Sequence, residues 1–154
     1  MDFVMADGPT GFTVDDAVAV ARRAHAGQTD KAGRPYIEHP LRVMARLAGD
    51  EERMAAVLHD VLEDTAVTVG DLRSAGCPEP VIAAVLALTK QPGESLAQSM
   101  ARAAADPIAR VVKRADIADN SDPRRLALLD RAAADRLRRK YADSIRLLDQ
   151  PRAR

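Results

Sequence analysis

The sequence predicts an all-α protein, a compact single-domain bundle of short helices, on three observations. Apolar residues recur at helical spacing along most of the 154-residue chain, and no segment shows the alternation of a half-buried strand. Prolines fall between the apolar runs and mark joints between helices. No internal repeat, low-complexity tract or linker divides the chain, so residues 1–154 are expected to form one domain. The joints lie at Pro78, Pro80, Pro92, Pro107 and Pro123.

The helices can be placed in order from their start and stop signals. Thr13 and Asp16 have the spacing of a capping box, so the first helix begins after Thr13 and ends near Gly27. Residues 28–36 are polar and punctuated by glycine and proline, which predicts a loop. Further helices are expected at residues 38–48, 50–64, 69–76, 79–89, 94–105, 107–121 and 133–149.

Composition excludes several classes of protein. With 47% hydrophobic and 30% charged residues and no Trp, the chain is expected to be soluble and globular, with an interior of small aliphatic side chains. The 23 basic residues equal the 23 acidic ones, so no polycationic charge is available to hold nucleic acid or an anionic membrane. Acidic residues are in excess in 1–109 and basic residues in 110–154. The basic part suits either an anionic ligand or a solvated helix face.

Compartment signals are few. The single Cys77 cannot form an internal disulfide, and no basic-then-apolar signal segment or long apolar run occurs. A reducing cytoplasm is therefore expected.

The strongest chemical signal lies at residues 59–64. Projected onto a helix, His59 and Glu63 fall close together, with Asp60 and Asp64 on the same side and apolar residues opposite. Like charges so crowded repel one another unless a cation or a proton compensates, which favours a metal site or a catalytic site. The alternative is an exposed helix face that carries its charges without function.

A second polar stripe lies in the helix expected at 107–121. Asp116, Asn120 and Lys113 share one side, while Asp119 falls at the border of the apolar side and is expected to cap or to support a ligand rather than to bind metal itself. The ammonium suits a phosphate. A solvated helix face is the alternative here as well.

His39 precedes Pro40 at the start of a helix and completes a candidate ligand set. Together with His59, Asp60 and Asp116 it offers two imidazoles and two carboxylates. Such a set suits one divalent ion with coordination positions left for water.

These segments, in this order, resemble the HD-type metal-dependent phosphohydrolases. The resemblance is closer still to the hydrolase domain of the RelA/SpoT alarmone enzymes and their small stand-alone relatives. The segments that carry it are His25–Gln28, Lys31–Gly33, Pro35–Pro40, Leu58–Thr65, Val112–Asp116 and Asn120.

The resemblance implies an all-α fold and removal of the 3′-pyrophosphate of guanosine alarmones, ppGpp and pppGpp, by metal-activated water. Glu63 and Asp64 match the catalytic pair that handles the attacking water and substrate protonation. Manganese is the implied metal, and its implied ligands are His39, His59, Asp60 and Asp116.

The resemblance also implies substrate contacts. Asn120 matches a residue at the sugar or phosphate, Lys31 matches one of two adjacent cations along the base, and Tyr36 matches a position lining the pocket. The second cation of the family is replaced here by Asp30, which cannot stack on a purine.

The last helix offers further cations. Arg136 and Lys140 share a flank of it and, with Lys113, are candidates to hold phosphates. An ordinary amphipathic surface helix explains the first two equally well. The opposite side should face inward and consists of Leu137, Tyr141, Ser144 and Leu148.

Three functions remain open at this point. The first is hydrolysis of guanosine alarmones, the second is hydrolysis of another nucleotide, such as an adenine alarmone or a nucleotidase substrate, and the third is non-catalytic nucleotide binding. A small-molecule nucleotide is the expected partner, with no nucleic acid and no membrane, and a homo-oligomer is left open. No synthetase domain is expected, since the chain ends at Arg154, so hydrolysis of alarmones would mean degradation alone.

Overall fold

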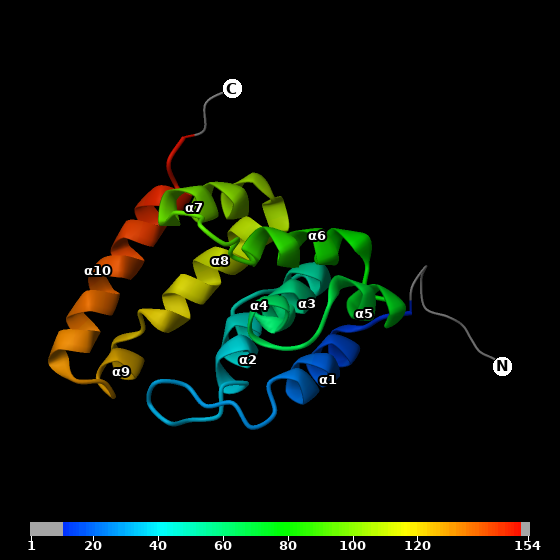
Figure 1. Ribbon diagram of the computed structural model, residues 1–154, viewed down its shortest axis with the longest axis horizontal. Coiled ribbons are helices and arrows are strands. Elements are labelled where there is room, and N and C mark those ends of the chain that lie inside the picture. Colours follow the sequence, from blue (N-terminus) through cyan, green and yellow to red (C-terminus); the bar gives the residue numbers. More distant parts are fainter. Residues whose placement is uncertain (1–10, 152–154) are drawn as a thin grey trace.

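A computed structural model describes residues 11–151 and confirms the all-α prediction (Figure 1). Within these residues the only strand-like pairing is an isolated bridge between Thr29 and Pro35. Residues 1–10 and 152–154 of the expected domain lie outside the described part. The helices are α1 (Val14–Ala24), α2 (Glu38–Ala45), α3 (Asp50–Leu58), α4 (Val61–Asp64), α5 (Val69–Ser74), α6 (Glu79–Leu88), α7 (Leu96–Ala105), α8 (Pro107–Asn120), α9 (Pro123–Leu126) and α10 (Arg131–Leu148).

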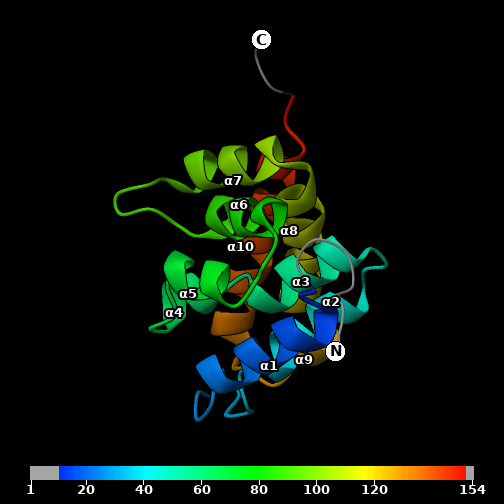
Figure 2. The same cartoon turned by 90° about the vertical axis from the view of Figure 1, so that its right-hand side faces the viewer.

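α3 is the centre of the main core. It packs against α1, α2, α6 and α8, and all five of its residues from Met54 to Leu58 are buried. Figures 1 and 2 both show it in the middle of the molecule. The small side chains Ala17, Ala21 and Ala109 are completely buried in the same core, which lets the helices approach closely.

A second, smaller core fixes α10. Ala103 of α7, Ile117 of α8 and Leu148 of α10 are buried against one another, with Tyr141 packed beside them. The inward face expected for this helix is confirmed, since Ser144 is buried as well. α10 therefore forms one flank of the molecule in Figure 1, beside α7 and α8.

Helix starts follow the expected capping chemistry. Thr13 accepts the backbone N–H of Asp16, and the Asp16 carboxylate accepts that of Thr13, so the predicted capping box is confirmed. The same reciprocal pair, Thr68 with Asp71, begins α5. None of the helices within residues 11–151 is long and apolar enough to span a bilayer.

The continuous helix expected at 50–64 is wrong. α3 ends at Leu58 and α4 begins at Val61, with His59 and Asp60 in a turn between them. Both His59 and Val61 are buried. The turn brings both side chains into the interior, whereas on a continuous helix they would lie about 200° apart.

The short helix α9 was not expected. It begins at Pro123, after Asp122 has capped it by accepting the N–H of Arg124, and its Leu126 is buried. Because it follows α8 after only two residues, α9 holds the chain beside the end of α8 that carries Asn120.

The loop of residues 25–37 closes the lower edge of the molecule in Figure 1. Its tip is a turn in which Gly33 has a φ of 82° and donates its N–H to the carbonyl of Asp30 at 2.9 Å. The N–H of Asp30 in turn donates to the carbonyl of Arg34 at 2.8 Å. The loop is thus closed by its own backbone and leads directly into α2.

Candidate metal centre

Three buried side chains from separate elements converge between α2, α3 and α8. His39 lies in the first turn of α2, His59 follows the last residue of α3, and Asp116 lies in α8. One ligand atom of each lies within 4.8 Å of the other two. Asp116 Oδ1 is 2.8 Å from His39 Nε2 and 3.3 Å from His59 Nε2. Two imidazole nitrogens and a carboxylate oxygen are donors that suit a divalent transition metal.

The second ring nitrogen of each histidine is fixed from behind. Nδ1 of His59 lies 2.6 Å from the carbonyl oxygen of Ala56, and because a carbonyl only accepts, this nitrogen donates. Nδ1 of His39 lies 2.6 Å from Oδ2 of Asp119 and donates to it. In neutral rings both Nε2 atoms then direct lone pairs at the Asp116 carboxylate. Lone pairs and carboxylate repel one another, and a cation between them removes this repulsion. The donor set therefore fits a divalent metal.

In the metal-free protein, protons must provide this compensation. Burial lowers the pKa of His59, but the charges of Asp60 and Asp116 outweigh it and raise that pKa well above its usual value. For His39, burial is likewise outweighed by the hydrogen bonds to Asp116 and Asp119, and its pKa is raised. Protons and a metal therefore compete for the same ring nitrogens.

Asp60 lies at the edge of this cluster. Its Oδ2 is 3.0 Å from His59 Nε2 and also accepts a hydrogen bond from the Tyr36 hydroxyl. Burial opposes ionisation of this carboxyl, but the neighbouring His59 lowers its pKa to about 2. The Tyr36 ring is supported by His25, at 4.9 Å between ring centroids. The turn after α3 thus places the His59 ring and the Asp60 carboxylate next to each other at the edge of the cluster.

The polar stripe of α8 is present as a hydrogen-bonded group. Lys113 Nζ donates to Asp116 Oδ2 at 3.0 Å, and Asn120 Nδ2 donates to Asp116 Oδ1 at 3.1 Å. Lys113 is mostly buried, which lowers its pKa, but the charge and the hydrogen bond of Asp116, together with the charge of Asp60, outweigh burial and raise that pKa. Both contacts hold the carboxylate in its ionised form with its oxygens toward the histidines.

Asp119 supports the ligands from behind. It is 1% exposed, and besides His39 it accepts hydrogen bonds from Arg42 Nε and Arg125 Nη1, each at 2.9 Å. Burial disfavours its charge, but these partners lower its pKa to about 2. The expectation that it supports a ligand agrees with this geometry.

Glu63 and Asp64 lie one turn beyond the cluster, in α4, and both are exposed. Glu63 Oε1 accepts the backbone N–H of Lys90 at 2.9 Å, which ties α4 to the loop after α6. Partial burial and then the charges of Asp60 and Glu63 raise the pKa of Asp64. The break after Leu58 places His59 and Asp60 in the turn and Glu63 and Asp64 in the short helix that follows it.

A cavity of about 610 Å³ adjoins the cluster. One side is polar and includes Lys31, Tyr36 and Asn120, three of the expected substrate contacts. The other side is apolar and is formed by Leu126, Leu128, Leu129, Leu137 and Tyr141. A cavity with one apolar wall and a few polar groups has the character of a site for a small organic ligand.

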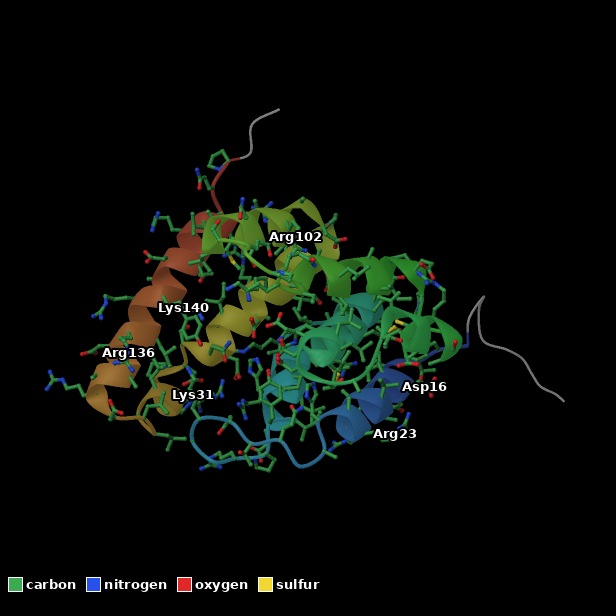
Figure 3. The ribbon with its side chains drawn as sticks, viewed as in Figure 1. Asp16, Arg23, Lys31, Arg102, Arg136 and Lys140 are labelled. Atoms are coloured by element: carbon green, nitrogen blue, oxygen red, sulfur yellow. The ribbon has the colours of Figure 1, made fainter. Side chains whose placement is uncertain are left out.

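The remaining expected cations do not line this cavity. Lys113 contacts Asp116, and Arg136 and Lys140 lie on exposed positions of α10, on the same side of Figure 3 as Lys31. Burial and then the charges of Lys113, Lys31 and Lys90 lower the pKa of Lys140. These lysines, from four separate elements, therefore share one region of positive potential beside the cluster.

Sequence reasoning missed two arginines of the site, Arg42 and Arg125. Both bind Asp119, and both line the cavity. The Asp-Pro pair at Asp122 and Pro123 is a helix-start signal that could have indicated α9 and hence the place of Arg125. No local pattern indicates Arg42 as a site residue, since its role depends on α2 packing against α8.

Comparison with known protein sequences gives three findings, and comparison with solved structures gives a fourth. A family model described as HD domain matches residues 17–147. The bifunctional (p)ppGpp synthase/hydrolase SpoT of Escherichia coli K12 is 52% identical over 60 residues, which are 36% of this chain and 8% of that protein. The GTP pyrophosphokinase of Streptomyces coelicolor is 47% identical over 64 residues, which are 39% of this chain and again 8% of that protein.

A solved structure of a metazoan ortholog of SpoT, described as hydrolysing ppGpp and as acting in starvation responses, matches over the whole fold. The TM-score is 0.69 at 25% identity, and the match covers 94% of this chain and 95% of that one. The bacterial relatives are thus matched over less than a tenth of their length, and the metazoan protein over almost all of it.

Proposed function

The chain belongs to the HD domain family, and we propose that it is a metal-dependent hydrolase that removes the 3′-pyrophosphate of guanosine alarmones, ppGpp and pppGpp. The observation that carries the proposal is the buried cluster of His39, His59 and Asp116. The two histidine rings are fixed so that their Nε2 atoms face Asp116, and the cluster lies beside a nucleotide-sized cavity. The family, the named relatives and the metazoan structure support the substrate class.

In this proposal one manganese ion is held by His39, His59, Asp60 and Asp116. When bound, a divalent ion lowers the pKa of a coordinated water and neutralises charge on the phosphate it touches. The protein's part is to hold the ligands. Asp119 and the Ala56 carbonyl fix the two ring tautomers, and Lys113 keeps the Asp116 carboxylate ionised.

Glu63 and Asp64 are proposed as the catalytic pair. Glu63, with one oxygen on the Lys90 N–H, has a fixed orientation from which it can accept a proton from the attacking water. Asp64 can donate a proton to the leaving oxygen, since burial and the charges of Asp60 and Glu63 raise its pKa. The two carboxyls thus differ in their surroundings, as an acid and a base must.

The substrate contacts follow from the cavity and the lysines beside it. The base would lie between the Lys31 side of the loop and the apolar wall of α9 and α10, with Tyr36 and Asn120 near the sugar. Lys113, Arg136 and Lys140 are proposed to hold phosphates, which the shared positive potential around Lys140 supports.

One observation favours a second candidate, hydrolysis of a different purine nucleotide. Asp30 lines the cavity at the place of a family cation, and its Oδ1 accepts the N–H groups of Ala32 and Arg34 while its Oδ2 faces Arg125. It therefore neither points freely into the pocket nor lies in solvent. A carboxylate has no stacking surface for any purine, and with both oxygens engaged in this way Asp30 is not available to accept from the N1–H and amine of guanine.

The test is a substrate panel. The manganese-loaded protein is incubated with guanine and adenine nucleotides, with and without a 3′-diphosphate, and the products are identified by mass. We expect pyrophosphate release from the guanosine 3′-diphosphates. Release from adenosine 3′-diphosphates alone would support the second candidate, and no release from any of them would contradict the proposal.

The family match and the fold also fit a single domain over residues 1–154, which we propose together with a cytoplasmic location. The single Cys77 is buried and free, as a reducing compartment allows. We propose a small-molecule nucleotide as its partner rather than nucleic acid or membrane. Gel filtration of the metal-loaded protein would establish whether it forms a homo-oligomer.

A further inference from the structure

Arg125 of α9 joins two parts of the site that are distant in the sequence. Its Nη1 donates to Asp119 Oδ2 at 2.9 Å and to Asn120 Oδ1 at 3.0 Å. Its Nη2 lies 3.5 Å from Asp30 Oδ2, on the loop of residues 25–37. One guanidinium therefore contacts both the end of α8 and the loop that forms the polar wall of the cavity.

At one end, this contact reaches a metal ligand. The Asp119 oxygen that accepts from Arg125 also accepts from His39 Nδ1, at 2.6 Å, and the opposite nitrogen of that ring faces Asp116. A change in the position of Arg125 therefore changes the carboxylate that orients the His39 ring. Replacing such a supporting partner typically weakens metal binding by about 10- to 100-fold.

At the other end, the contact reaches the pocket wall. The Asp30 side chain is 10% exposed, and its Oδ1 accepts the N–H groups of Ala32 and Arg34 at 2.9 and 3.0 Å. These bonds make Asp30 rigid with the turn of its loop. The neighbouring Lys31 lines the cavity from that same turn.

The strength of this connection comes from its geometry rather than from one ion pair. An isolated pair at a partly exposed side chain contributes little, and the Arg125 side chain is 25% exposed. The planar guanidinium, however, holds Asp30, Asp119 and Asn120 at once, which a flexible point charge could not do. Loss of any one partner frees the others to move.

We propose that Arg125 is a positioning residue that couples the loop bearing Lys31 to the metal ligand His39. The wall of the nucleotide pocket and the metal site are then set together, so that a ligand filling the cavity tightens metal binding and metal tightens ligand binding by the same factor. The nucleotide part of this inference rests on the proposed function, whereas the metal part does not.

The chain offers a matched control in Arg42. Its Nε donates to the other oxygen of Asp119 at 2.9 Å, the same distance as Arg125, and its second ion pair is with Glu38 on its own helix. Replacing Arg42 therefore removes one hydrogen bond to Asp119, as replacing Arg125 does. It leaves the contact between Arg125 and Asp30 in place.

The first experiment measures manganese affinity of the chelator-stripped protein by equilibrium dialysis. Arg125→Gln should weaken binding about tenfold, within the usual range for a group supporting a ligand. Asp30→Asn, which keeps the oxygen that accepts from the loop, should weaken it about threefold in the natural sequence, less than the loss of a direct supporting partner. Added to Arg125→Gln, the Asp30→Asn change should weaken manganese binding no further. Added to Arg42→Gln, it should again weaken manganese binding about threefold.

An equal effect of Asp30→Asn in all backgrounds, or no effect in the natural sequence, would overturn the coupling. If Arg125→Gln does not fold, as judged by circular dichroism, Arg125→Lys takes its place, because it keeps a positive charge but lacks the planar guanidinium that holds both partners. The second experiment measures hydrolysis, where Arg125→Gln and Asp30→Asn should raise KM more than they lower kcat. A protein that hydrolyses none of the nucleotides would refute the proposed function and leave the dialysis result to decide the coupling.

Discussion

The metal side and the pocket side of the site are built in different ways. The metal side consists of buried groups on α2, α8 and the turn after α3, each held by two or more short contacts. The pocket side is formed by the loop of residues 25–37, the short α9 and one face of α10, and much of it is exposed. Chemistry that requires fixed geometry lies in the core, and recognition lies on irregular segments that tolerate sequence change.

The largest effect is expected from removing a metal ligand. The protein should bind about one divalent ion per chain, because His39, His59, Asp60 and Asp116 form one ligand set and leave coordination positions open. His59→Ala and Asp60→Ala should each abolish stoichiometric metal, measured by elemental analysis after dialysis, and activity should be lost with it. Leu128→Ala on the pocket side is the control and should keep the metal. Full metal content in both ligand variants would show that the ion lies elsewhere.

How far the sequence predicts the site follows the same division. His39, His59 and Asp116 come together as expected, because each stands in a short motif that can be recognised in the sequence itself. The Asp30 contact with Arg125 could not be expected. Arg125 lies on a helix that the sequence did not predict, and it is 95 positions from Asp30 in the chain. The interruption at His59 and Asp60 was also missed, because no proline or glycine marks it and the helical periodicity of apolar residues continues through it.

The next effect separates metal binding from catalysis. Glu63→Gln should keep metal and substrate binding but lower kcat about 10²-fold, the usual scale for a positioned base. Its amide oxygen can still accept from the Lys90 N–H, so the loop should stay in place. Asp64→Asn is the matched variant for the proposed acid. Normal turnover by Glu63→Gln would assign water activation to Asp64.

A smaller effect should come from behind the ligands. Asp119→Asn removes the charge that holds His39 Nδ1, and manganese affinity should fall by roughly 10- to 100-fold. Asp122→Asn is the control, because Asp122 caps α9 without contact to a ligand. Isothermal titration of the metal-free variants compares the two. Equal affinities would mean that the His39 ring needs no support from Asp119.

On the pocket side, the lysines should differ from the exposed arginine. Lys140→Met should raise KM about tenfold, equivalent to about 1.4 kcal/mol, because Lys140 shares the positive region with Lys31 and Lys113. Arg136→Met, one turn earlier and also exposed, is the comparison and should raise KM by less. Steady-state kinetics at two salt concentrations would check this, since the Lys140 effect should shrink as salt screens the charges. A larger effect at Arg136 would reverse the assignment of the phosphate contact.

The smallest effect concerns stability at the loop that carries Lys90. Arg102 donates to both oxygens of Glu94 and to the Thr89 carbonyl, and the Arg102 hydrogen bonds lower the pKa of Glu94 to about 2. A carboxyl whose pKa is depressed in the folded state stabilises the protein above its unfolded value of about 4.3. That contribution is lost as the pH falls from about 5 toward 2. Thermal unfolding of Glu94→Gln should therefore give a lower Tm at neutral pH, and the difference from the natural protein should vanish in acid. A difference that is constant with pH would mean that the carboxylate charge at position 94 contributes nothing and that the amide is destabilising for steric reasons.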